Sequence, residues 1–163
     1  MLKPQIEKEL NNQLNRESFS AYLYLSMAAY FENENLKGFA HWLKVQAKEE
    51  TGHAMKFFNH IIERNGKVSL EKIDAPKTVW NSPLEAFQDA YEHEKKITNF
   101  INEILEIAKS EKDYATDNFL QWFVSEQVEE EAQTLEIVQK LKQINASVGG
   151  LLVLDHHLGK REG

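Results

Sequence analysis

Cysteine is absent from this chain of 163 residues, which excludes disulfides, thiolate metal sites and iron–sulfur clusters. Glycine and proline are scarce, at 7 and 3 residues, and this lack of turn-forming residues favours an all-helical protein. No apolar run approaches the ~20 residues that span a bilayer, and the first residues lack the apolar segment of a signal peptide. We therefore expect a cytoplasmic protein without a membrane segment.

The composition suits a protein with a substantial core, because 42% of the residues are hydrophobic and 28% are charged. At this length the whole chain, residues 1–163, is expected to form one compact domain. The net charge of −7 argues against nucleic acid as a partner and mildly favours the attraction of cations. A soluble, self-repelling surface explains the same charge at least as well.

Four long segments carry apolar residues in alternating steps of three and four, the pattern of amphipathic helices. They cover about residues 4–33, 36–65, 83–110 and 114–145, with tight turns near Glu34 and Lys112. Ser82 and Glu85 form a capping-box sequence around Pro83, which predicts the start of the third helix. The short turns make each hairpin antiparallel.

Residues 67–81, between the two hairpins, show no helical period and are too many for an antiparallel turn. At about 3.3 Å per residue this segment can cover ~50 Å, enough to pass along a helix of ~45 Å. Gly149 and Gly150 then break the chain before a short apolar segment, residues 151–158. The expected fold is all-α: a four-helix bundle with one long crossover and a short fifth C-terminal helix.

Polar residues interrupt the apolar stripe of each long helix at matched positions. Glu17 and Glu50 are 33 positions apart, and so are Glu94 and Gln127. Counted from the turns, the members of each pair lie level to within about 2 to 5 Å. Burying an unpartnered carboxylate costs several kcal/mol, roughly, so several of them buried together make sense mainly if a cation neutralises them.

The residue types in this layer are those of a metal site. Glu50 and His53 are neighbours on one helical face and can share a metal with Glu17. Glu94 and Glu130 can form a second half-site, with Glu50 as the bridge. A neighbouring glutamine, Gln127, is a weak ligand or a hydrogen-bond donor there. Carboxylate oxygens with one imidazole suit iron or manganese, and zinc less exclusively.

Two other features bear on this layer. Buried salt bridges would be the alternative to a metal, but the stripe positions contain no lysine or arginine. Gly52 lies between Glu50 and His53, inside the second helix, where glycine costs about 1 kcal/mol against alanine. Close approach of a second helix and simple toleration explain this glycine equally well.

The sequence closely resembles the non-haem ferritins of bacteria and archaea, members of the ferritin-like di-iron family. The motifs that carry the resemblance lie in residues 11–24, 49–54, 91–94 and 122–131, and the similarity covers essentially the whole chain. It implies a ferritin-like bundle, assembled as a homo-oligomeric cage of two dozen subunits. It also implies ferroxidase activity, with Fe(II) and O2 as substrates and a ferric mineral stored inside the cage.

The resemblance assigns roles residue by residue. The first iron site is implied at Glu17, Glu50 and His53. The second is implied at Glu50, Glu94 and Glu130, with Gln127 beside it. A third is implied at Glu49, Glu126, Glu129 and Glu130. Tyr24 matches a family tyrosine that can supply an electron, although a core aromatic bonded to a ligand carboxylate is a compatible role.

Related families differ from this chain at specific positions. Haem-containing bacterioferritins carry methionine directly after the bridging glutamate, where this chain has Thr51, and they use Glu-x-x-His twice. The second motif here reads Gln127-x-x-Glu130, so no haem is expected. Rubrerythrins need cysteine, and mini-ferritins build their site between subunits from a different pattern.

Two rival functions remain open at this point. One is a di-iron or di-manganese enzyme that activates oxygen for an organic substrate, although the short chain offers no obvious extra module. The other is a helical scaffold with incidental metal binding. Assembly into a larger particle favours storage, and residues 151–154 are too apolar to be exposed in a monomer.

Overall fold

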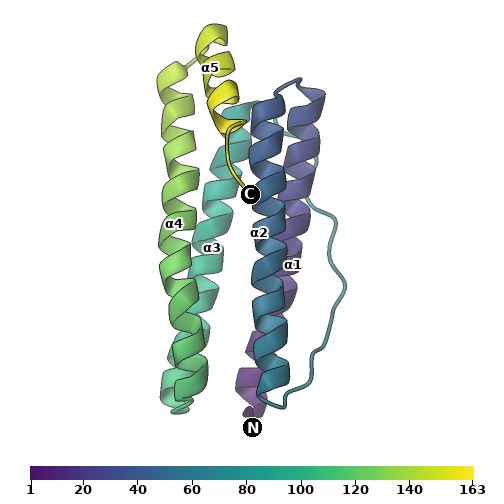
Figure 1. The fold of residues 1–163 in the computed structure, drawn as a ribbon, viewed down its shortest axis with the longest axis vertical. Helices are drawn as coiled ribbons and strands as arrows, with labels where there is room; N and C mark the ends of the chain where they lie inside the picture. The colour runs from purple at the N-terminus through teal and green to yellow at the C-terminus, as the bar shows by residue number, and fades with distance from the viewer.

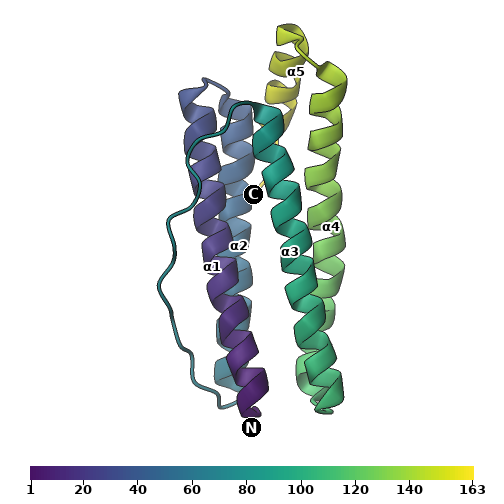
Figure 2. The same ribbon diagram turned by 180° about the vertical axis from the view of Figure 1, so that it is seen from behind.

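The computed structural model describes all 163 residues and contains five helices and no strand. Four long helices lie side by side as a bundle, and a short fifth packs at one end (Figure 1, Figure 2). The helices are α1 (Pro4–Asn33), α2 (Lys37–Glu63), α3 (Pro83–Ser110), α4 (Tyr114–Ile144) and α5 (Val148–Leu158). The all-α bundle expected from the sequence is confirmed. None of the five helices combines the length and the hydrophobicity that a membrane-spanning segment needs.

Side-chain caps and left-handed residues fix the helix ends. Ser82 caps α3 by accepting a hydrogen bond from the backbone N–H of Glu85 at 3.1 Å. The carboxylate of Glu85 reaches back to the N–H of Asn81, one residue earlier than an ordinary capping box requires. Positive φ angles of 54° to 57° occur at Asn35, Asn65, Lys112 and Asn145, where the chain leaves a helix.

The start of α5 corrects one expectation. Gly149 and Gly150 were expected to break the chain before the fifth helix, but both lie inside α5. Ser147 caps the helix by accepting a hydrogen bond from the N–H of Gly150 at 3.1 Å. A good N-cap contributes about 1 kcal/mol, which offsets most of the helical cost of a glycine.

The connection between α2 and α3 passes along α1 over the length of the bundle, as Figure 2 shows. Asn11 binds it through both ends of its side-chain amide, to the carbonyl of Lys67 and the N–H of Ser69. Farther along, the Ser26 hydroxyl donates to the carbonyl of Lys77 at 2.7 Å. The predicted crossover is therefore confirmed, and it makes α2 and α3 start at the same end.

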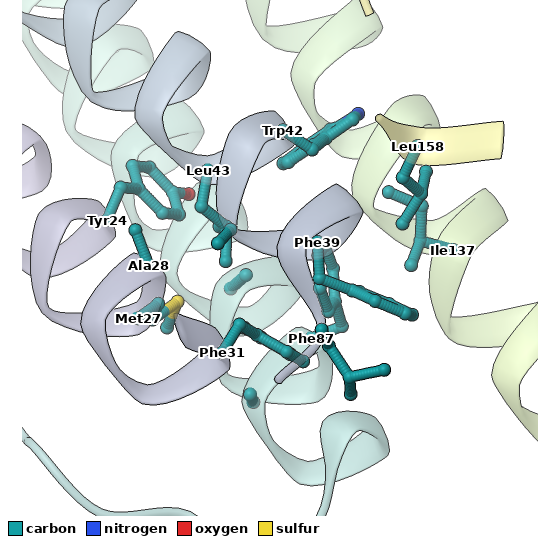
Figure 3. Close-up of a cluster of buried hydrophobic side chains, with 14 of the residues drawn as sticks. Tyr24, Met27, Ala28, Phe31, Phe39, Trp42, Leu43, Phe87, Ile137 and Leu158 are labelled. Atoms are coloured by element: carbon teal, nitrogen blue, oxygen red, sulfur yellow. The ribbon is translucent and has the colours of Figure 1, made fainter. Parts of the chain in front are cut away.

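The apolar core has two parts, which lie on either side of the polar layer. One part surrounds the stacked rings of Phe31 and Phe39, whose centroids are 4.8 Å apart, with Phe87 beside them (Figure 3). The other surrounds Phe57 and Phe123 toward the opposite end. Rigid packing above and below holds the polar layer at a fixed height.

Candidate metal centre

Six polar side chains from all four long helices meet in the layer between the two apolar parts. Each is between 1% and 4% exposed. They are Glu17 from α1, Glu50 and His53 from α2, Glu94 from α3, and Gln127 and Glu130 from α4. Their meeting at one height is the arrangement that the hairpin counts predicted.

The first group of possible ligands joins α1 and α2. His53 Nδ1 lies 3.1 Å from Glu50 Oε2 and 3.9 Å from Glu17 Oε2. One ligand atom from each residue lies within 4.8 Å of the others, close enough to share one ion. Glu17 Oε2 is buried and has no hydrogen-bond partner. A carboxylate oxygen left free in this way is costly unless a cation binds it.

The second group joins α2, α3 and α4. Ligand atoms of Glu50, Glu94 and Glu130 also lie within 4.8 Å of one another, so Glu50 is common to both groups. Tyr24 donates its hydroxyl hydrogen to Glu94 Oε1. Gln127 Nε2 donates to Glu94 Oε2 at 3.1 Å. The tyrosine and the glutamine therefore act on Glu94 from both sides and orient it toward Glu50.

Two glutamines in this layer were missed by the sequence interpretation. Gln13 Nε2 donates to Glu17 Oε1 at 2.7 Å, and Gln46 Nε2 donates to Glu50 Oε1 at 3.0 Å. Gln46 Nε2 also reaches Glu130 Oε2 at 2.6 Å, which ties the two groups together. The signal was available, because each glutamine stands four residues before a buried glutamate on the same helical face.

Burial sets the protonation of the layer. It raises the pKa of Glu17 well above its usual range, and the charge of Glu50 raises it further. Burial and the neighbouring charge of Glu94 raise the pKa of Glu130 to about 8. No lysine or arginine enters the layer to oppose these shifts, so burial favours the protonated, neutral form of both carboxyls.

A third group lies at the edge of the layer, toward α4. Glu126 Oε1 is 3.8 Å from His53 Nε2, and these two residues form a possible ligand set with Glu130. Glu49 and Glu129 contribute no atom to this group. Glu49 instead accepts a hydrogen bond from Arg161 Nη2 at 2.7 Å. The structure thus brings together two of the four residues, Glu126 and Glu130, that the resemblance assigns to a third iron site.

The structure excludes one of the two explanations for Gly52. A Cβ added at this glycine would meet no atom within 4 Å. Close approach of another helix of the same chain is therefore not the reason for the glycine.

Comparisons with known proteins agree over almost the entire chain. Residues 7–144 match the family described as a ferritin-like domain. The chain is 44% identical over 161 residues to a bacterial non-heme ferritin of Bacteroides fragilis, covering 99% of this chain and 100% of that one. A bacterial non-heme ferritin of Staphylococcus aureus is 39% identical over 161 residues, with 99% and 97% covered.

Solved structures give the same result. An open pore ferritin from the hyperthermophilic archaeon Archaeoglobus fulgidus superposes with a TM-score of 0.98. Its sequence is 50% identical, and the match covers 99% of this chain and 100% of that chain. The similarity therefore extends to the whole bundle, including the crossover and α5.

Proposed function

Since the chain belongs to the ferritin family of iron-storage proteins, we propose that its buried carboxylate layer is a ferroxidase centre. The observation that carries the proposal is the sharing of Glu50 by two ligand groups in a layer that contains no lysine or arginine. Two adjacent metal ions would offset the buried anionic charge of this layer. Iron is the expected ion, because carboxylate oxygens with one imidazole suit it.

The residues act on Fe(II) as a pair of unlike half-sites. Glu17, Glu50 and His53 bind one ion, while Glu50, Glu94 and Glu130 bind the other. The protons on these carboxyls leave as the ions arrive, and the anionic oxygens favour the ferric product. Two ferrous ions give up one electron each, and O2 takes both electrons with two protons. A two-electron step of this kind avoids the release of superoxide.

The half-sites differ in a way that suits transfer of iron onward. Gln127 occupies the position that corresponds to a charged ligand elsewhere in the layer, and it supplies a hydrogen bond to Glu94 instead. The second ion therefore has one anionic ligand fewer than a glutamate at position 127 would give it, and it binds less tightly than it would beside that glutamate. Tyr24 touches Glu94 through its hydroxyl, which puts it where it can supply an electron to the pair.

Storage requires assembly around a cavity. We propose that each chain acts as a single domain, residues 1–163, and that 24 copies form a cytoplasmic cage. Support comes from α5, where Val148, Leu152 and Val153 are between 55% and 72% exposed in the single chain. Apolar side chains this exposed on one short helix favour burial against other copies.

The test is aerobic loading with Fe(II) followed by size-exclusion chromatography with iron analysis. A large particle that retains many iron atoms per subunit is the expected result. A small oligomer that holds two or three ions would instead favour an oxygen-activating enzyme or a scaffold with incidental metal binding.

A further inference from the structure

The C-terminal tail passes down between α2 and α4 and ends beside α2 in the upper half of the bundle (Figure 1). Its residue Arg161 is held by four contacts. The guanidinium lies over the ring of Trp42, 4.2 Å from the centroid, and Nη1 donates to the Trp42 carbonyl at 3.1 Å. Nη2 donates to Glu49, and His41 Nε2 lies 2.7 Å from the Arg161 carbonyl oxygen. Only 14% of the Arg161 side chain is exposed.

The docking of α5 on α2 determines where this arginine falls. Gly38 lies against the backbone of α5 so closely that a Cβ on it would stand 1.6 Å from the carbonyl oxygen of Asp155. Asp155 Oδ1 accepts a hydrogen bond from the N–H of Phe39 at 3.0 Å. The tail leaves α5 from this fixed point, so the position of Arg161 follows from the fold and is not that of a free surface side chain.

The partner that Arg161 holds, Glu49, is not among the third ligand group but stands beside the metal centre in the chain. Glu49 directly precedes Glu50 on α2, and its charge acts on both Glu126 and Glu130. Arginine keeps its positive charge at every physiological pH and has no lone pair to offer a metal. The Arg161 guanidinium therefore competes with a metal ion for Glu49, and it cannot itself serve as a metal ligand in place of Glu49.

We propose that Arg161 is a positioning residue that sets the metal affinity of the outer carboxylates, Glu49, Glu126 and Glu130. It is a tethered counter-cation that holds Glu49, and an arriving metal ion must displace it. The inference rests on the proposed function, because it assumes that metal ions reach this face of the layer. Its consequence is an ordered filling of the centre. The inner ligand groups fill first, and the outer group fills only when metal is abundant enough to displace the guanidinium.

The experiment is calorimetric titration of the assembled, metal-free protein with Zn(II), which binds the same ligand types without redox chemistry. The wild-type protein is expected to bind two ions tightly and a third more weakly. Arg161→Ala and Arg161→Gln should bind the third ion about three- to tenfold more tightly, the range of a partly exposed charge pair. Arg161→Gln keeps most of the stem over Trp42, so it also covers the case in which alanine disturbs the tail.

Lys160→Ala is the matched control. Lys160 is an exposed neighbour in the same tail and does not contact Glu49, so this variant removes the same charge without freeing the carboxylate. It should bind the third ion as the wild type does. Arg161→Lys should lie close to the wild type, because an ammonium can still pair with Glu49. In a Glu49→Gln background, Arg161→Gln should no longer change the third affinity.

An unchanged third affinity in both Arg161 variants overturns the proposal, and so does a loss of thermal stability with no change in metal binding. Absence of a third ion in every variant overturns it as well. The proposed function is judged separately, by the first two ions and by iron loading, so either idea can fail without the other.

Discussion

The side-chain amide of Gln127 donates a hydrogen bond to the carboxylate of Glu94 across the α3–α4 hairpin, Nε2 to Oε2, at 3.1 Å. The same nitrogen lies 3.2 Å from the backbone carbonyl of Glu94 and 3.2 Å from Thr98 Oγ1. All three neighbours are hydrogen-bond acceptors, so Gln127 is a donor in this structure. The residue that makes the two half-sites unequal is thus already engaged in orienting one of the ligands.

Gln127→Glu should strengthen the second half-site. The added carboxylate gives the second metal another anionic ligand, so we expect its affinity to rise at least several-fold, measured by Zn(II) titration. The metal-free protein should lose about 1–3 kcal/mol, because two carboxylates then face each other without the amide donor. Oxidised iron should also leave the centre more slowly, and unchanged release would contradict the account of Gln127.

Glu17→Ala and His53→Ala remove one ligand each from the first group. We expect the initial rate of Fe(II) oxidation to fall at least about tenfold in each, because losing even an outer partner of a metal ligand typically costs about 10- to 100-fold. The protein should remain folded by circular dichroism. Glu103→Ala, on the exposed face of α3, is the control and should oxidise Fe(II) at the wild-type rate. Wild-type oxidation rates in Glu17→Ala and His53→Ala, as in the Glu103→Ala control, would contradict the assignment.

The stability of the metal-free protein should fall as the pH rises from 6.5 to 8.5. The pKa of Glu130 is about 8 in the folded protein, against 4.5 when unfolded. Between these two pKa values the folded state holds a proton that the unfolded state has lost. The free energy of unfolding therefore falls as the pH rises, until the pH passes about 8. At about 1.4 kcal/mol per pKa unit the loss over this window is about 2 kcal/mol, roughly 4–8 °C in Tm.

The pH window starts at 6.5 so that the protonation of His93 does not contribute to the change in stability. Burial lowers the pKa of His93 to about 4, so that residue destabilises the fold only below pH 6.5. Glu130→Gln should flatten the profile, and bound Zn(II) should do the same, because metal replaces the proton. A thermal unfolding series in the presence of a chelator tests this, and a Tm that rises with pH would contradict the assignment of the proton.

Two glycines in α2 should respond to alanine in opposite directions. Gly52→Ala places a Cβ in open space and removes a mid-helix glycine, so we expect a gain of about 0.5–1 kcal/mol. Gly38→Ala places a Cβ against the backbone of Asp155 and should displace α5. Thermal unfolding and size-exclusion chromatography measure both effects, and a stable, fully assembled Gly38→Ala protein would contradict the docking described for α5.

Tyr24→Phe separates the two roles of the tyrosine. If Tyr24 supplies an electron, the variant should bind two metal ions with wild-type affinity and oxidise Fe(II) several-fold more slowly. A hydroxyl that serves only to orient Glu94 would instead leave a weaker second metal site. Zn(II) titration and stopped-flow oxidation of the same preparation distinguish these outcomes, with wild-type protein as the reference.

Most of the helical framework followed from the sequence, because periodic apolar residues and hairpin lengths are local features. The predicted limits of the four long helices lie within two residues of those observed, and the crossover follows from a length that no tight turn can use. The start of α5 was misjudged because two consecutive glycines predict a break in a helix, whereas here the Ser147 cap allows both to lie in its first turn. No role in the site was predicted for Gln13 and Gln46, because an uncharged amide does not stand out in a sequence as a candidate metal ligand.

The sequence by itself determined the height of the polar layer and the chemical types in it, since helical period and residue spacing fix both. Only the tertiary structure decided which oxygen of Glu17 is left without a partner, and which acceptors Gln46 joins. It alone brought Arg161 to Glu49, 112 residues away. Such contacts depend on side-chain rotamers and on the docking of α5. Neither can be predicted from the periodicity of the sequence.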